Sequence, residues 1–191
     1  MEARFVYLAG KIHMNGWRKA IVPRLREMAN DTDDIFDIDP TITVINRLYV
    51  TGPFFISCDH GCYHGDGAHG VGADGEGCDG SGVPCSGAGI PVDVVPKVCM
   101  DQIERSNFVF AYIDDDTCFG TLCEIGYAIG KGIPVAIMLS TDNLRKSMWF
   151  ISQMADIEFA KDGFMLKSNV KDPLINRAAI EIADILSRGG E

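Results

Sequence analysis

The sequence predicts an α/β fold in which a parallel β-sheet is covered by helices on both faces. Short apolar runs typical of buried strands alternate along the chain with segments whose apolar residues recur at helical spacing. Parallel strands need a long crossover between them, which is usually a helix, so this alternation favours parallel pairing. The chain has 191 residues, 47% of them hydrophobic, which is enough for one full core. We therefore expect one domain over residues 1–191.

The pattern begins with a strand and a helix. Residues 5–10 form a short apolar run that ends at glycine, as expected of a buried strand. Residues 15–28 carry apolar side chains at helical spacing, with Asn15 as a cap and Pro23 as a kink or break. Residues 35–38 are interpreted as a second, short strand.

Regular structure is predicted again from residue 92. A helix there places Cys99, Gln102 and Ile103 on one face. In the helix that follows the central strand, Gly126 and Ala128 are interpreted as allowing close packing on the sheet. The remaining predicted elements are a central strand over 108–113, a helix over 121–130, a strand over 133–139 and a terminal helix over 172–188.

Residues 49–91 differ in composition and are predicted to form an irregular insert. Twelve of the 21 glycines, three of the four histidines and four of the seven cysteines lie there, and so many glycines disfavour helix or strand. Cys58, His60, Cys62 and His64 place four zinc-type ligands within seven residues. A structural zinc is one interpretation. The alternatives are histidines that line the mouth of an active site, incidental thiols and a disordered loop.

Charge and hydropathy exclude some classes of partner. The net charge of −10 repels phosphate backbones, so duplex nucleic acid is not expected as a partner. No apolar run approaches the roughly 18 residues of a membrane span, and the N-terminus lacks the pattern of a signal peptide. We therefore expect no membrane partner and a cytoplasmic location, where the seven cysteines would be mostly reduced.

Polar residues follow two of the predicted strands. The carboxyl ends of parallel strands meet at one edge of the sheet, where ligands bind in such folds. Glu124 is expected in the first turn of the helix after the central strand, facing this edge. The structural alternative is that Thr121 and Glu124 match the S/T-x-x-E capping box and only stabilise the start of that helix. The substrate-binding candidates at this edge are Gly10, Lys11, Asp114, Gly120 and Thr121.

Two of these segments resemble the nucleoside 2-deoxyribosyltransferase family, including its hydrolase relatives. Residues 7–10 (YLAG) and 120–128 (GTLCEIGYA) are similar to the family's motifs. Residues 103–111 are similar to the segment that leads into its central strand. The resemblance covers about residues 4–30 and 95–140 and excludes the insert. It implies a flavodoxin-like or Rossmann-like parallel sheet.

The resemblance also implies an activity, which is cleavage of the N-glycosidic bond of a nucleoside or nucleotide. Glu124 matches the glutamate that attacks the anomeric carbon, and Tyr7 matches the tyrosine that holds that carboxylate. A second base or water would then resolve the glycosyl ester, by the two-displacement logic of retaining glycosidases. No cofactor is required for this chemistry. The alternative is a sensor module that binds a nucleotide without turning it over.

Two positions depart from the family's pattern. Cys118 stands where the family has an aspartate six residues before the glutamate, and Cys99 stands at a second aspartate position. Asp114, Asp115 and Asp116 are candidates to replace the first aspartate, and Asp101, two residues beyond Cys99, is a candidate to replace the second. The acid that protonates the leaving base therefore stays unassigned. A shift of two residues turns a helical side chain by about 200°, so a solvated surface position is the alternative for Asp101.

Further expectations concern a homo-oligomer and a phosphate. Asn143 is loosely similar to an asparagine that relatives donate to a neighbour's active site, and its alternative role is that of a turn residue. The apolar residues 148–150 favour an oligomer interface nearby. Lys11, His13 and Arg18 follow the first strand, where they are candidates to contact a 5′-phosphate or to be solvated.

Overall fold

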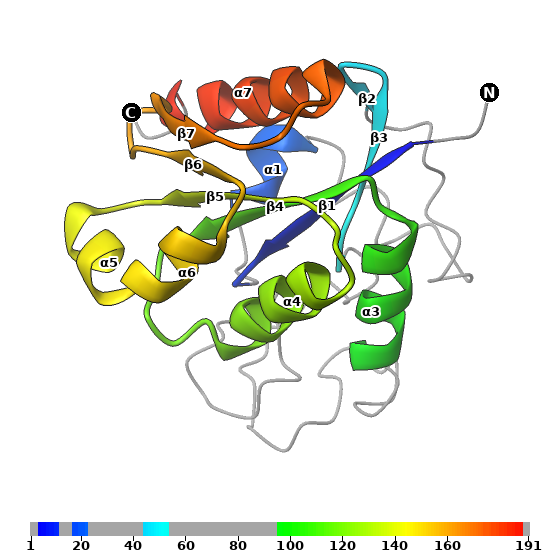
Figure 1. The fold of residues 1–191 in the computed structure, drawn as a ribbon, viewed down its shortest axis with the longest axis horizontal. Coiled ribbons are helices and arrows are strands. Elements are labelled where there is room, and N and C mark those ends of the chain that lie inside the picture. Colours follow the sequence, from blue (N-terminus) through cyan, green and yellow to red (C-terminus); the bar gives the residue numbers. More distant parts are fainter. Residues whose placement is uncertain (1–3, 12–16, 23–43, 54–94, 189–191) are drawn as a thin grey trace, which may run out of the picture.

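A computed structural model describes residues 4–11, 17–22, 44–53 and 95–188, and a seven-stranded sheet runs through its centre (Figure 1). The strands are β1 (Phe5–Gly10), β2 (Val44–Ile45), β3 (Leu48–Thr51), β4 (Phe108–Ile113), β5 (Val135–Leu139), β6 (Ile157–Phe159) and β7 (Met165–Ser168). The helices are α1 (Arg18–Ile21), α3 (Val95–Arg105), α4 (Phe119–Gly130), α5 (Asp142–Ser147), α6 (Trp149–Met154) and α7 (Pro173–Arg188). None of these helices combines the length and apolar character needed to cross a bilayer.

The strand order is β2-β3-β1-β4-β5-β6-β7. Pairing is parallel from β3 to β6, whereas the edge strands β2 and β7 pair antiparallel to their neighbours. Counted in chain order, the five parallel strands follow the order 2-1-3-4-5, which is that of flavodoxin-like folds. The predicted fold class is therefore confirmed. The order reverses between β1 and β4, the point where ligands bind in open parallel sheets.

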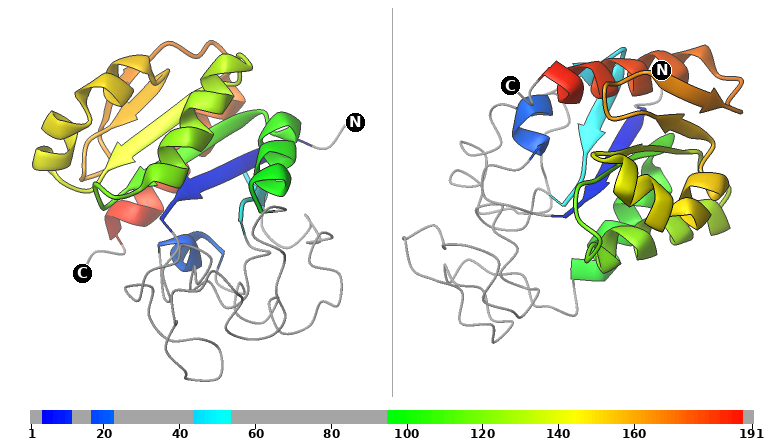
Figure 2. Two further views of the ribbon diagram at one scale, coloured as in Figure 1. Left: turned by 90° about the horizontal axis from the view of Figure 1, so that it is seen from below. Right: turned by 90° about the vertical axis from the view of Figure 1, so that its left-hand side faces the viewer.

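Helices cover both faces of the sheet. α1 and α7 lie on one face, and α3, α4, α5 and α6 lie on the other (Figures 1 and 2). Alternation along β1 divides its side chains accordingly, because Val6 and Leu8 join the core under α7 and Tyr7 and Ala9 join the core under α3 and α4. Tyr7 thus carries a hydroxyl group into a layer that is mostly apolar.

Several predicted boundaries need correction. The insert does not begin at residue 49, because β3 runs to Thr51 with Leu48 and Val50 buried. Asn46 and Arg47 have positive φ angles and form the two-residue turn that joins β2 to β3. The expected cap at Asn15, the kink at Pro23, the strand over 35–38 and most of the insert lie outside the described residues.

Gly126 does not pack against the sheet as predicted. It is exposed on α4, and a side chain added there would have no atom within 4 Å. Ala128 is fully buried and does make the predicted contact. The helix also begins at Phe119, two residues before the predicted start, so its first turn contains earlier residues than predicted.

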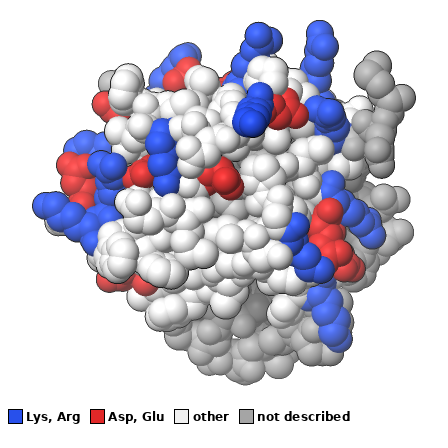
Figure 3. Space-filling view, viewed as in Figure 1, with Lys and Arg blue, Asp and Glu red and all other residues white. Residues whose placement is uncertain are grey.

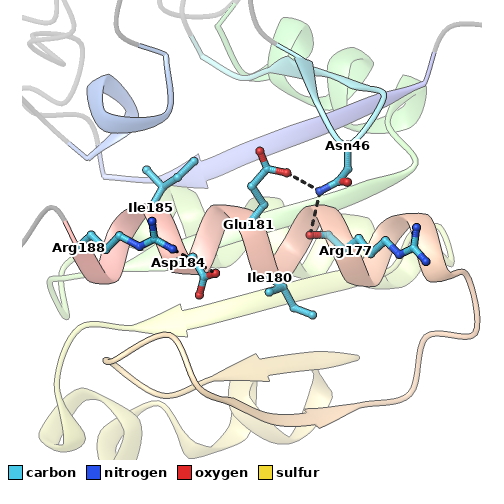
Figure 4. A pocket seen from close by; sticks show the side chains of 7 residues that line it. All are labelled: Asn46, Arg177, Ile180, Glu181, Asp184, Ile185 and Arg188. Carbon is cyan, nitrogen blue, oxygen red and sulfur yellow. Dashed lines mark hydrogen bonds and ion pairs between the residues drawn. The ribbon is translucent and has the colours of Figure 1, made fainter.

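A hollow lies beside α7, on the face away from Tyr7 (Figure 4). The tip of the β2–β3 turn closes one side, where the Asn46 side-chain amide donates to the Arg177 carbonyl oxygen and to the Glu181 carboxylate. These bonds dock the β2–β3 hairpin on α7, so we assign this region a structural role. Its lining consists of Asn46, Arg177, Ile180, Glu181, Asp184, Ile185 and Arg188.

Gly10 gives a test of packing at the end of β1. A Cβ atom there would lie 2.7 Å from Cζ2 of Trp17 and 2.8 Å from the Tyr112 carbonyl oxygen. We expect Gly10→Ala to lower the free energy of unfolding by about 1–3 kcal/mol, because backbone and ring would both have to shift. Urea denaturation measures this change. The control Gly126→Ala fills open space on a helix and is expected to add about 0.5–1 kcal/mol, so equal stability of the two variants would contradict the assignment.

Candidate functional site

Tyr7 and Glu124 meet in the layer between the sheet and α4. The Tyr7 hydroxyl donates a hydrogen bond to Oε1 of Glu124 over 2.6 Å. Tyr7 is fully buried, and Glu124 is 9% exposed. The two residues are 117 positions apart in the sequence. The pairing of β1 with β4 brings them together, because α4 follows β4 directly and packs on both strands.

Glu124 does not occupy the position predicted for it on the helix. α4 begins at Phe119 with Cys118 as the N-cap, and no side chain caps this end. Thr121 and Glu124 are therefore the third and sixth residues of the helix, and the capping box does not form. The structural alternative for Glu124 is wrong for this reason. The prediction of a first-turn residue facing the edge is also wrong, since Glu124 reaches beneath the helix to the middle of β1.

Burial changes the acidity of both groups. Loss of hydration raises the pKa of Glu124 to about 7, although the Tyr7 hydrogen bond, the charge of Arg18 and the Cys99 thiol all favour the ionised form. Burial also raises the pKa of Tyr7 well above its usual value, and the adjacent Glu124 adds to this effect. At neutral pH the tyrosine therefore keeps its proton and donates the hydrogen bond, and the glutamate is close to half protonated.

Cys99 lies in the same buried core as Tyr7, although no role was predicted for it from the sequence. It is buried on the inner face of α3. Burial, followed by the charge of Glu124, raises the pKa of its thiol to about 12. Asp101 is exposed on the same helix and is not brought to Tyr7 and Glu124. The rotation of about 200° over two residues accounts for this difference. The register of α3 was the available signal, because Cys99 was already predicted on its buried face.

Arg18 does not extend toward a substrate phosphate. Its side chain is only 2% exposed, and its guanidinium donates to three main-chain carbonyl oxygens at the end of β1. The shortest of these bonds, from Nη2 to the Gly10 oxygen, measures 2.7 Å. The guanidinium also lies 4.7 Å from the centroid of the Trp17 ring. Arg18 therefore provides hydrogen-bond donors for the carbonyl oxygens at the end of β1, and its buried positive charge lies near Glu124.

The polar residues at the switch point form a second group. Nζ of Lys11 lies 3.0 Å from Oδ2 of Asp115 and 2.8 Å from the Thr117 hydroxyl oxygen, so Lys11 ties the end of β1 to the β4–α4 loop. Bonds from the Thr117 side chain and backbone, and then from Lys11, hold the pKa of Asp115 well below its usual range. Asp114 is half-buried at the end of β4, and Gly120 is exposed on α4.

Cys118, like Cys99, occupies a position at which the resemblance implies an aspartate. It is buried, and this burial raises the pKa of its thiol to about 11. The nearby charges are those of Asp115, Asp114 and Lys11 rather than that of Glu124. Cys118 thus lies beside the switch-point group, and it also belongs to the packed core that contains Tyr7.

Asn143 lies on α5, on the same side of the sheet as α4. It is exposed near the start of that helix, where the Thr141 hydroxyl accepts a hydrogen bond from the Leu144 amide. This position agrees with the alternative role near a helix start. The structure does not bring Asn143 to Glu124 within one chain.

The zinc hypothesis falls on residues that the structure does not describe. Cys58, His60, Cys62 and His64 all lie within residues 54–94. Among the described residues, no three histidine, cysteine, aspartate or glutamate side chains are placed so that they could hold a metal ion. The structural zinc therefore stays a prediction, and His13 also lies outside the described residues.

Comparison with known protein-family models gave no match, and comparison with curated proteins gave none either.

The raised pKa of Glu124 has a consequence for stability. The folded-state pKa of about 7 exceeds the ordinary value of 4.5, so folding disfavours ionisation. The contribution of protonated Glu124 to the free energy of unfolding is fully present below pH 4.5 and is lost as the pH rises through 7. Glutamine does not ionise, so Glu124→Gln should not show this loss. As the pH rises from 4.5 to 8, the free energy of unfolding of the variant should increase relative to that of the parent by about 3 kcal/mol. Denaturant unfolding over that range measures the difference, and a constant difference would contradict the assignment.

Proposed function

We propose that this protein cleaves the N-glycosidic bond of a nucleoside or nucleotide through a glycosyl ester on Glu124. The observation that carries the proposal is the buried hydrogen bond between Tyr7 and Glu124 at 2.6 Å. A tyrosine in this position fixes one carboxyl oxygen and so limits the orientations of the other. The resemblance of residues 7–10 and 120–128 to the deoxyribosyltransferase family supports the same assignment.

The environment of Glu124 suits a nucleophile. A carboxylate removed from water is more basic than a solvated one, which is reflected in its pKa of about 7. In the first displacement a carboxylate oxygen would bond to the anomeric carbon while the bond to the base nitrogen breaks, and the base leaves with the bonding electron pair. The negative charge of Glu124 would stabilise the oxocarbenium-like transition state. Tyr7, protonated throughout, would keep the carboxylate aligned.

The second displacement would release the sugar from Glu124. Attack by a nitrogen of another base gives transfer, and attack by water gives hydrolysis, with the proton of the attacking group passing to the medium or to a basic group. Either acceptor regenerates the carboxylate with net retention at the anomeric carbon. The proposal requires no metal ion or organic cofactor for either step.

A sensor module is the second candidate function. It is favoured by the exposure of Asp101 and by the presence of Cys118, because neither places a carboxylic acid beside Glu124 to protonate a leaving base. A sensor would bind nucleotides with measurable affinity and leave them intact. Incubation with deoxynucleosides and free bases, followed by chromatographic separation of the products, separates these functions.

The nucleophile has a direct test. We expect Glu124→Gln to abolish turnover while it keeps the fold, because an amide cannot form the ester. A 2-fluoro-2-deoxy sugar nucleoside should leave a covalent mass increment on Glu124 of the parent, identified by peptide mass spectrometry. The matched control is Glu104→Gln, which alters an exposed carboxylate on α3 and should retain both activity and label. Turnover by Glu124→Gln near the parent rate would refute the nucleophile.

We also propose a homo-oligomer that uses the apolar surface of α6. Trp149 and Phe150 are 61% and 59% exposed, and their rings pack edge to face at 5.7 Å. Met154 on the same helix is 40% exposed. On the face of the molecule shown in Figure 3, charged side chains gather mainly at the margins, and the middle carries few of them. An apolar patch of this kind is more typical of an interface than of open surface.

Light scattering at micromolar concentration tests the oligomer. We expect at least a dimer for the parent and a shift toward monomer in the double variant Trp149→Asp, Phe150→Asp, with a similar melting temperature. Phe164→Asp alters an equally exposed aromatic residue outside α6 and should leave the mass unchanged. A monomeric parent would overturn this proposal.

A further inference from the structure

The loop between β4 and α4 holds an anion of its own, which is the carboxylate of Asp115. One oxygen, Oδ1, accepts hydrogen bonds from the Thr117 amide over 2.6 Å and from the Thr117 hydroxyl. The other oxygen, Oδ2, lies 3.0 Å from Nζ of Lys11, which directly follows β1. Nζ of Lys11 also donates to the Thr117 hydroxyl oxygen over 2.8 Å. An ammonium group, a main-chain amide and a hydroxyl group are therefore gathered around one carboxylate.

The donors around Asp115 are of the kinds with which proteins bind phosphate. They come from two segments that are 104 positions apart in the sequence and meet where the strand order reverses. Ligands of open parallel sheets bind at this switch point, and the sequence predicted Lys11 as a contact for a 5′-phosphate. The donors that such a phosphate would use are therefore already directed at Asp115.

Lys11 and Arg18, the two described residues that were predicted to contact a phosphate, are both used inside the protein. Bonds from the Thr117 side chain and backbone, and then from Lys11, hold the pKa of Asp115 well below its usual range, so the carboxylate is ionised. Its negative charge compensates that of Lys11. The guanidinium of Arg18 is directed at the carbonyl oxygens of β1, and the residue is only 2% exposed. The residues before and after Asp115 are also aspartates, which add to the negative charge of this loop.

We propose that Asp115 is a specificity residue, whose carboxylate fills the anion-binding position at the switch point and so excludes substrates that carry a 5′-phosphate. This inference rests on the proposed function and narrows its substrate class to nucleosides without a phosphate. The phosphate of a nucleotide would meet an ionised carboxylate in place of unoccupied donors, and like charges brought close together repel. The alternative is that the ion pair with Lys11 only ties β1 to the loop.

The test compares each deoxynucleoside that the parent cleaves with its own 5′-monophosphate. The ratio of the two kcat/KM values, nucleoside over monophosphate, is measured for the parent and three variants. Asp115→Asn removes the charge but keeps an oxygen that can accept the bond from the Thr117 amide, so the loop retains that contact. The matched control Asp116→Asn removes the same charge from an exposed position of the same loop. The double variant Lys11→Met, Asp115→Asn removes the cation as well.

We expect the parent to favour the nucleoside by about 10-fold or more, which is the scale of one contact between like charges near a protein surface. Asp115→Asn should lower this ratio by about 10-fold, because Lys11 then becomes available to the phosphate. The double variant should lose most of that gain. Asp116→Asn should change the ratio by less than about 3-fold, since salt screens an exposed charge.

A second measurement does not depend on turnover. Inorganic phosphate is titrated into each protein, and its dissociation constant is measured by calorimetry. We expect Asp115→Asn to bind phosphate about 10-fold more tightly than the parent does. The double variant with Lys11→Met and the control Asp116→Asn should both bind it as weakly as the parent.

The outcomes separate this inference from the proposed function. A parent that cleaves monophosphates as fast as nucleosides would overturn the inference and retain the enzyme. An unchanged ratio in Asp115→Asn, or an equal shift in Asp116→Asn, would also overturn it, since the ion pair would then be structural or net charge alone would set the specificity. A parent that cleaves neither substrate would refute the proposed function. Phosphate binding then decides, because a gain in Asp115→Asn that requires Lys11 retains the occupied anion position and the absence of a gain overturns it.

Discussion

Burial of β1 on both faces and both edges is the constraint on which the rest of the structure depends. β3 and β4 pair with its two edges, and helices cover its two faces. A polar group on such a strand must find a partner inside the protein, because an unsatisfied buried hydroxyl costs about 1–3 kcal/mol. Tyr7 carries a hydroxyl, and Glu124 is the acceptor that α4 supplies. The same burial raises the pKa of the carboxyl group to about 7.

The end of β1 follows the same rule. Its last carbonyl groups leave the sheet beside the switch point, and Arg18 satisfies them with a charged fork of donors. The buried cation then lies close enough to favour ionisation of Glu124. Lys11 ties the same edge to the β4–α4 loop through Asp115. The end of β1 is therefore held in place by Arg18 and Lys11, and the charge of Arg18 also acts on the candidate site.

Prediction from the sequence succeeded where hydrophobic periodicity was long and continuous. The runs over β1 and β4 and the apolar face of α3 showed their burial directly, because strand and helix periods differ. It failed at Gly126, since a glycine has no side chain whose pattern could show which face of α4 it occupies. It also failed at the capping box of Thr121 and Glu124, because four residues match a local motif whether or not the helix starts there. Asp101 and Cys99 differ by a helical rotation of about 200°, and the apolar face predicted for α3 had already placed Cys99 on the buried side.

The sequence by itself determined the α/β class, the buried strands and the nomination of Tyr7 and Glu124, since these depend on local pattern and on motif resemblance. Only the tertiary structure decided that the two side chains meet, that Cys99 lies in the same buried core as Tyr7, and that Arg18 is used inside the fold. The physical reason is that these contacts join residues from separate elements. Their distances follow from strand order and helix packing, which no local stretch of sequence specifies.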